Sequence, residues 1–293
     1  DSGETEYYNV EEYFRLRPTD TRMYVLNYER TMNQIFNSEN SFAKDPTNIM
    51  LGIRDGSVEY KTNEAENVVA FVQQGDLFSY NQTNNELTKV FSFRSPEGID
   101  IRENWNQHDI KIVSVDEAGS IDFIVYGYMN RGNHEGEVGT CVYHYDGLAH
   151  TIEEEAFIPS KSSYEVLKAE MGKLLYVNEN GILYLMFEGN VYEIKLDSLK
   201  VEKIVKNLEA GCYATSYDNQ YFSWVDVDSQ YSTTELSVMN LKTKEVIKIN
   251  KGDDQYLRPL GFIGNDFIYG VANAADVISD AAGNTTFPMH SII

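Results

Sequence analysis

Residues 189–207, GNVYEIKLDSLKVEKIVKN, decide the fold because they form a pattern of two short strands joined by a polar turn. Apolar and polar side chains alternate from Val191 to Leu196, and after Asp-Ser a second alternating run leads to Val205. Alternation with a period of two residues indicates strands with one buried face, and the polar turn indicates an antiparallel hairpin. A single hairpin cannot bury its apolar face, so we expect partner strands elsewhere in the chain.

Four further segments repeat this pattern of strand, polar turn and strand. They are residues 23–37 (MYVLNYERTMNQIFN), 77–93 (LFSYNQTNNELTKVFSF), 141–157 (CVYHYDGLAHTIEEEAF) and 236–250 (LSVMNLKTKEVIKIN). A second pattern, an apolar strand followed by a turn and an aromatic-rich strand, alternates with the first. Its copies are residues 110–128, 173–187, 212–227 and 260–272, and either 49–60 or 67–75 supplies a fifth.

The two patterns together make a four-stranded antiparallel unit that recurs every 45 to 64 residues. Propeller blades are units of about this size, and neighbouring blades in a ring cover the faces that one small sheet leaves open. A β-sandwich also has many short strands, but it does not account for paired hairpins at a nearly fixed spacing. We therefore predict an all-β fold, a β-propeller of four-stranded antiparallel blades, with about five blades or as part of a larger propeller.

The two ends of the repeat are incomplete in complementary ways. The hairpin at residues 23–37 has no partner hairpin before it, and the one at 260–272 has no full partner after it. Because propellers often build one blade from both ends of the chain, we expect these two hairpins to pair and close the ring. The competing expectation is that residues 287–293 (FPMHSII) begin another hairpin of a longer protein.

The blade sequence ENGILYLMFEGNVYEIKLDSLKVEKI, residues 179–204, resembles those of TolB-like and related uncharacterised bacterial propellers, often found at the cell surface or anchored to lipid. The resemblance covers most of residues 20–293 and is one of general pattern. It implies a binding module or scaffold that works outside the cytoplasm, in the cell envelope or secreted. It implies no particular activity.

Two segments depart from the repeat, and together with the first residues they suggest the domain organisation. Residues 1–6 (DSGETE) resemble the acidic tether that follows a removed signal or lipid-anchor segment. Residues 11–18 (EEYFRLRP) are expected to form a short helix or a lead-in that ends at Pro18, and residues 160–172 a linker with about one helical turn. We predict a tether and lead-in over 1–19 and a propeller domain over 20–293.

The charge of the chain limits its partners. With 24 Lys and Arg against 46 Asp and Glu, the net charge is −22, which repels nucleic acid and anionic lipid. No run approaches the roughly 18 apolar residues of a membrane span, so any membrane or lipid anchor would lie upstream. The expected partner is a protein or a glycan. Cys141 and Cys212 both lie in apolar strand patterns; we expect buried thiols, with a disulfide between them as the alternative.

The segment from Tyr126 to Thr140, YGYMNRGNHEGEVGT, is the most unusual in the chain and supplies the candidate binding residues. Loops on a rigid scaffold often carry binding residues. The set consists of Tyr128, Arg131, His134 and Glu135. The alternative is an ordinary solvated loop. A zinc-peptidase site would need a second histidine four residues after His134, where Val138 stands.

No motif points to catalysis, so we predict a non-enzymatic module without a cofactor. The alternative is a glycoside hydrolase-like enzyme with converging carboxylates. Its candidates lie at turns and strand starts and are Asp116, Asp122, Asp218, Asp226 and Asp266. Residues 224–232 and 275–286 combine carboxylates with Asn or Ser, which makes calcium the one metal considered. Neither segment fits a twelve-residue calcium loop.

Overall fold

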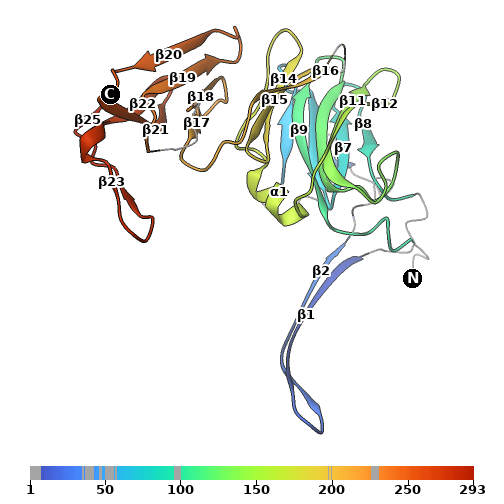
Figure 1. Ribbon diagram of the computed structural model, residues 1–293. Helices are drawn as coiled ribbons and strands as arrows, with labels where there is room; N and C mark the ends of the chain where they lie inside the picture. Colours follow the sequence, from blue (N-terminus) through green and yellow to red (C-terminus); the bar gives the residue numbers. More distant parts are fainter. Residues whose placement is uncertain are drawn as a thin grey trace, which may run out of the picture.

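The computed structural model describes residues 8–34, 36, 43–45, 48–49, 56, 58–95, 100–196, 198, 200–225 and 231–293. The predicted tether over residues 1–6 lies outside this range. Nearly all described elements are strands, and they form several antiparallel sheets that follow one another along the chain (Figure 1). The predicted all-β fold is confirmed, and the sheets have the strand order of propeller blades.

Four sheets have four strands each, and in each the strands lie side by side in sequence order. Blade 1 comprises β5 (Tyr60–Thr62), β6 (Val68–Gln73), β7 (Asp76–Asn81) and β8 (Glu86–Phe91). Blade 2 comprises β9 (His108–Val115), β10 (Ile121–Tyr128), β11 (Val138–Asp146) and β12 (Thr151–Pro159). Blade 3 comprises β13 (Leu175–Val177), β14 (Ile182–Phe187), β15 (Asn190–Lys195) and β16 (Lys200–Val205). Blade 4 comprises β17 (Tyr213–Thr215), β18 (Tyr221–Trp224), β19 (Glu235–Asn240) and β20 (Val246–Asn250).

These blades confirm the two alternating hairpin patterns. The first pattern supplies the third and fourth strands of each blade, as in the pairing of Val191 with Val205 between β15 and β16. The second supplies the first and second strands. Of the two candidates for the copy nearest the start, residues 67–75 provide β6. The alternation in the sequence therefore identified the strands, and the order of the two patterns identified their places in the sheet. The central strands, such as β14 and β15, are nevertheless buried along almost their whole length, because neighbouring blades cover both of their faces.

The fifth blade has three strands, β21 (Gln255–Ile263), β22 (Asp266–Asn273) and β25 (Ser291–Ile292). Gly270 and Val271 of β22 pair with Ile292 and Ser291, so the last residues of the chain supply its third strand. The prediction that residues 23–37 would pair with this blade and close the ring is wrong. The blades form an open arc, with the first and fifth far apart (Figure 1).

Residues 8–34 form a long hairpin, here called the arm, that projects from the blades (Figure 1). Its strands are β1 (Tyr8–Pro18) and β2 (Met23–Gln34). Of the two expectations for residues 11–18, the short helix is wrong, because Phe14 and Leu16 alternate with polar residues, which favours a strand. The alternative, a lead-in segment that ends at Pro18, agrees with the end of β1. The predicted hairpin at residues 23–37 is also wrong: residues 23–34 form one strand, and the turn lies upstream at Thr19 and Asp20. The predicted boundary between residues 19 and 20 falls within that turn.

The core lies between neighbouring blades in three clusters of buried side chains. One joins blades 1 and 2 and includes Phe123 and Ile112; a second joins blades 2 and 3. The third joins blades 3, 4 and 5 around Tyr184, Phe222 and Leu257. Helix α1 (Tyr164–Glu170), the predicted helical turn between blades 2 and 3, packs Leu167 into the second cluster.

The remaining elements are short. They are β3 (Ala43–Asp45), β4 (Asn48–Ile49), the 3₁₀ helix η1 (Ala274–Asp276), β23 (Ile278–Ser279) and β24 (Thr285–Thr286). Within the described residues, no helix is long and apolar enough to cross a lipid bilayer.

Candidate functional site

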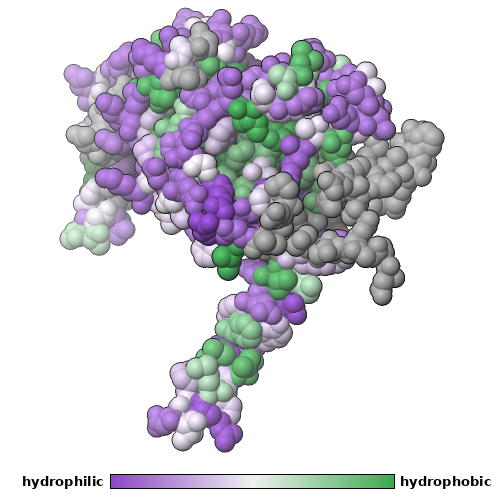
Figure 2. Space-filling view, turned by 90° about the vertical axis from the view of Figure 1, so that its right-hand side faces the viewer, coloured by the Kyte–Doolittle hydropathy of each residue, from purple (hydrophilic) through white to green (hydrophobic). Residues whose placement is uncertain are grey.

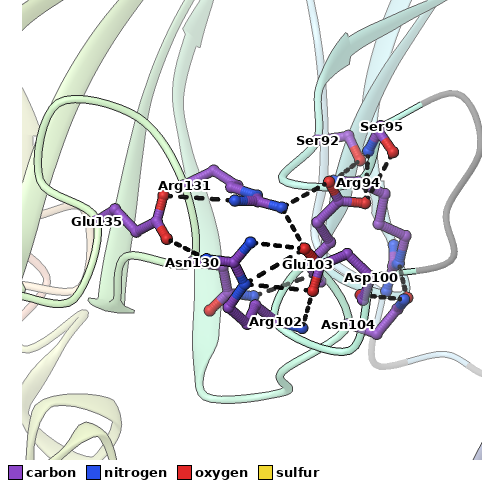
Figure 3. Close-up of polar contacts among 10 residues, drawn as sticks. All are labelled: Ser92, Arg94, Ser95, Asp100, Arg102, Glu103, Asn104, Asn130, Arg131 and Glu135. Carbon is purple, nitrogen blue, oxygen red and sulfur yellow. Dashed lines mark hydrogen bonds and ion pairs between the residues drawn. The ribbon is translucent and has the colours of Figure 1, made fainter.

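The predicted loop lies beside the segment that joins blades 1 and 2, and ion pairs connect the two (Figure 3). Arg131 is central: its Nη2 lies 2.6 Å from Oδ2 of Asp100 and 3.2 Å from Oε1 of Glu103. Its Nη1 lies 3.6 Å from Oε2 of Glu135, four residues later in the same loop. Arg102 pairs with Asp100 at 2.8 Å and with Glu135 at 3.2 Å. Arg131 and Arg102 thus share the carboxylates of Asp100 and Glu135.

Two acids of this network, Asp100 and Glu103, are held in their charged form. Hydrogen bonds from the side chain and backbone of Arg102 hold the pKa of Asp100 well below its usual range. The backbone N–H and the hydroxyl of Ser95 lower the pKa of Glu103. Asn130 donates from Nδ2 to the carbonyl oxygen of Trp105 at 2.8 Å. The network therefore acts as a clamp between two loops, in which Arg102 has two carboxylate partners and Arg131 has three.

The four predicted binding residues are only partly brought together. Arg131 and Glu135 lie in the clamp, but Nε2 of His134 lies 2.8 Å from Oε1 of Glu154 on β12. The ring of His134 stacks on Phe157, with 3.7 Å between ring centroids. Tyr128 is half-buried at the end of β10, where its backbone N–H donates to the carbonyl oxygen of Gln107. Binding through this set stays a prediction, with Arg131 and Glu135 as its paired members.

A pocket of about 530 Å³ lies at the base of the arm, and sequence reasoning missed it. Six parts of the chain converge there: the end of β2, residues 58–59 before β5, the residues around the β6–β7 turn, the start of β9, Tyr126 of β10, and helix α1. Most of its lining side chains can form hydrogen bonds. These are Asn33, Gln34, Glu59, Gln73, Gln74, Asn106, His108, Asp109, Lys111, Tyr126, Tyr164 and Lys168.

Helix α1 places two of these groups on one carboxylate. Tyr164 and Lys168 lie four residues apart and therefore share a helix face. The Tyr164 hydroxyl donates to Oδ2 of Asp109 at 2.8 Å, and Nζ of Lys168 lies 2.8 Å from the same oxygen. Burial, with the charge of Asp109 nearby, raises the pKa of Tyr164 to about 12. Burial raises the pKa of Tyr126 as well, so both hydroxyls stay protonated and able to donate.

A second ion pair lines the same pocket. Nζ of Lys111, on β9, donates to Oε2 of Glu59 at 2.9 Å, and both side chains are about 30% exposed. The pocket therefore presents two carboxylates, each held by a lysine, together with several amide side chains. Such an arrangement suits a neutral ligand rich in hydroxyl or amide groups, because the lining side chains offer both hydrogen-bond donors and acceptors.

The pocket residues escaped prediction because each belongs to an ordinary element. Asp109 and Lys111 alternate with apolar residues along a strand, and Tyr164 and Lys168 lie in what the sequence presents as a linker. The only indication of a polar site in the sequence was that His108, Asp109 and Lys111 stand close together. Without the fold, nothing places these side chains beside residues some 50 positions away.

The aspartates considered for catalysis do not converge on this pocket. Asp116 and Asp218 lie in the first turns of blades 2 and 4, and Asp266 begins β22 of blade 5. Asp122 pairs with Nδ1 of His144 at 2.7 Å on the surface of blade 2. Asp226 lies outside the described residues. The two carboxylates that do line the pocket, Glu59 and Asp109, were not among the candidates.

The remaining sequence expectations concern cysteines and metals. Cys141 and Cys212 are both buried and free, as expected, and burial raises the pKa of Cys141 to about 12. Residues 226–230 of the first calcium candidate lie outside the described range. In the second, Asp280 accepts hydrogen bonds from the backbone of Ala282 and Asn284 and so closes the turn between β23 and β24. Across the described residues, no three His, Cys, Asp or Glu side chains form a metal-binding group.

No family model and no curated protein matches the chain. Similar solved structures include dipeptidyl peptidase 4 from Porphyromonas gingivalis, 10% identical, covering 97% of this chain and 46% of that one, with a TM-score of 0.44. TolB from Acinetobacter baumannii is 11% identical over 76% of this chain and 49% of its own, with a TM-score of 0.35. The tricorn protease is 14% identical over 78% of this chain and 20% of its own, with a TM-score of 0.39. The chain thus spans less than half the length of each of these proteins.

Proposed function

We propose that this chain is a non-enzymatic propeller module that works outside the cytoplasm and binds a glycan in the pocket at the base of the arm. The proposal rests on the pocket itself, where amide, hydroxyl and paired ionic groups from six parts of the chain surround about 530 Å³. Sugars present many hydroxyls at fixed spacing, and each can donate to a carboxylate or amide oxygen and accept from a lysine or tyrosine. The extracytoplasmic location rests on the sequence alone, through the resemblance to cell-surface propellers.

The charge arrangement supports binding over catalysis. A glycoside hydrolase needs one carboxylic acid to donate a proton and a second carboxylate to act as base or nucleophile. Here Asp109 is held by Lys168 and Tyr164, and Glu59 by Lys111. Each carboxylate already accepts from a lysine, which fixes it as a hydrogen-bond acceptor toward a ligand and leaves no free acid–base pair in the pocket. The enzyme remains the second candidate because two carboxylates do line one pocket.

The proposal can be tested by screening neutral and amino-sugar oligosaccharides on a glycan array, followed by calorimetry with the best ligand. Lys111→Met should weaken binding at least about tenfold, because it removes a donor from the pocket and leaves Glu59 without its partner. Lys200→Met is the matched control, because it breaks an exposed ion pair with Glu202 on blade 3. Its affinity should equal that of the wild type.

Three outcomes would count against the proposal. If no glycan binds, the proposal that the ligand is a glycan is wrong. If wild type and Lys111→Met bind equally, the proposal that the ligand binds in this pocket is wrong. Recovery of cleaved oligosaccharide by mass spectrometry would replace binding with hydrolysis. In that last case, Asp109→Asn and Glu59→Gln would identify which of the two carboxylates takes part.

A further inference from the structure

The arm is an amphipathic ribbon with one apolar and one polar face. In an antiparallel pair, directly opposite residues share a face, and successive residues alternate between faces. The pairs Val10–Met32, Phe14–Tyr28 and Leu16–Val25 therefore lie on one side, with a bulge between the last two pairs. The apolar face comprises Tyr8, Val10, Phe14, Leu16, Met23, Val25, Tyr28 and Met32, interrupted by the pair of Glu12 and Arg30.

This apolar face is uncovered. Its eight large side chains are each between 40% and 63% exposed, and Figure 2 shows several hydrophobic patches along the arm, with hydrophilic surface between them and at its far end. An isolated two-stranded hairpin is at best marginally stable in water, so such a face needs a partner. Covering it would bury on the order of 700 Å² per copy, close to the roughly 800 Å² per partner of a standard protein interface.

The charges on the arm are divided along its length. The half nearest the turn, residues 14–28, has three arginines and one aspartate, a net charge of +2. The half nearest the blades, residues 8–13 and 29–34, has three glutamates and one arginine, a net charge of −2. Apart from Glu12 and Arg30, which pair with each other, these charges lie on the polar face or in the turn. Two identical arms laid antiparallel, apolar face to apolar face, therefore bury no unpaired charge, and the positive half of each runs alongside the negative half of the other.

From these observations, we propose that the apolar face of the arm is covered by the same face of a second copy of this chain, in a two-fold symmetric, antiparallel dimer. Phe14 and Tyr28, whose ring centroids lie 4.8 Å apart near the middle of the ribbon, form the centre of the interface. Aromatic residues at the centre of an interface usually contribute most of the binding free energy. The proposal is independent of the ligand in the pocket.

The geometry also accommodates the large negative charge of each copy. Two overlapping arms hold the blades of the two copies apart by about the length of an eleven-residue strand, roughly 36 Å. This distance exceeds the Debye length of about 8 Å at physiological salt, so the blades repel each other little. A lipid surface suits the arm less well, because its most distant residues are polar: Thr19, Asp20 and Thr21.

Two neighbouring residues on opposite faces provide a matched test. Phe14 is 50% exposed on the apolar face, and Tyr13 is 56% exposed on the polar face, opposite Glu29. Sedimentation velocity over about 1–100 μM should show a concentration-dependent dimer for the wild type and for Tyr13→Ser. Phe14→Ser should raise the dimer dissociation constant at least about tenfold. Circular dichroism should confirm that both variants remain folded.

Cross-linking distinguishes this dimer from other associations. Because Phe14 lies near the two-fold axis, Phe14→Cys should form a disulfide-linked dimer under mild oxidation, whereas Tyr13→Cys should dimerise without forming a disulfide link. The native cysteines are buried and should not interfere. A wild-type chain that is monomeric at about 100 μM, equal weakening by both serine variants, or sedimentation of monomers with phosphatidylcholine–phosphatidylglycerol vesicles would each overturn the proposal.

Discussion

Glu155 is a partly buried acid whose charged form destabilises the folded state. It is the unpaired residue of a bulge in β12, because Ala156 pairs with Val142 and Glu154 with Tyr143. Its Oε2 is buried, and no described group forms a hydrogen bond with it. Burial, with the negative charge of Asp122 nearby, raises the pKa of Glu155 to about 7.

We expect Glu155→Gln to stabilise the protein at high pH. Between the usual glutamate pKa of about 4.3 and the raised value, the folded state binds the proton more tightly than the unfolded state. The contribution of this group to stability is therefore present at low pH and is lost as the pH rises toward 8. Because Glu155 is only half-buried, the variant should gain about 1 kcal/mol at pH 8 and little at pH 5, as measured by urea unfolding. An equal gain at both pH values would contradict the role of ionisation.

Two histidines should shift stability in opposite directions with pH. Burial lowers the pKa of His108, so its stabilising neutral form is present above about pH 6.5 and that contribution is lost as the pH falls. Partial burial acts the same way on His144, but the hydrogen bond and charge of Asp122 outweigh it and raise its pKa. Its contribution is present below about pH 6.5 and is lost as the pH rises through the raised pKa.

In urea unfolding between about pH 5 and pH 8, His108→Gln should reduce the loss of stability on the acid side. His144→Gln should reduce the loss on the alkaline side, and the same change in both variants would contradict the assignment.

At the scale of secondary structure, the sequence was informative where a pattern repeated and misleading where it did not. Four blades could be predicted because the same alternation recurs with turns of similar composition. The arm could not, because residues 23–37 resemble the repeated hairpin, and only the long register of β1 with β2 distinguishes them. The Arg131–Glu135 pair could be suspected from one unusual loop. The pocket could not, because its residues meet only through the packing of blade 1, blade 2 and helix α1.

Substitution of Gly127 would test how tightly β10 of blade 2 packs against the segment at Gln107 and His108. Gly127 in β10 has a φ of +117°, and a Cβ there would overlap the carbonyl oxygen of Gln107 and lie 2.8 Å from Cα of His108. Gly119 also has a positive φ, +85°, but nothing lies within 4 Å of its Cβ position. We expect Gly119→Ala to cost about 1 kcal/mol, from backbone conformation alone, and Gly127→Ala at least about 3 kcal/mol. Equal losses in chemical denaturation would show that β10 can move away from the Gln107 segment.

At the scale of the whole molecule, the blades are linked in series by the three buried clusters. Each cluster takes side chains from neighbouring blades, and blades 2 and 3 each contribute to two of them. A blade that unfolded alone would expose apolar surface on its neighbours as well as its own. That shared cost opposes partial unfolding, even though the arc is open and has no closing contact between the first and fifth blades.

We therefore expect the blades to unfold in one cooperative transition. Trp224 is 8% exposed in the cluster of blades 3 to 5, whereas Trp105 is 55% exposed in the segment between blades 1 and 2. In Trp105→Phe, fluorescence reports only the C-terminal cluster, and far-UV circular dichroism reports the strands of all blades. The two signals should follow the same guanidinium midpoint and slope, because coincident probes are the mark of a two-state transition. An earlier fluorescence transition would mean that blades 3 to 5 unfold separately, and that the cluster between blades 2 and 3 is too weak to couple the halves of the arc.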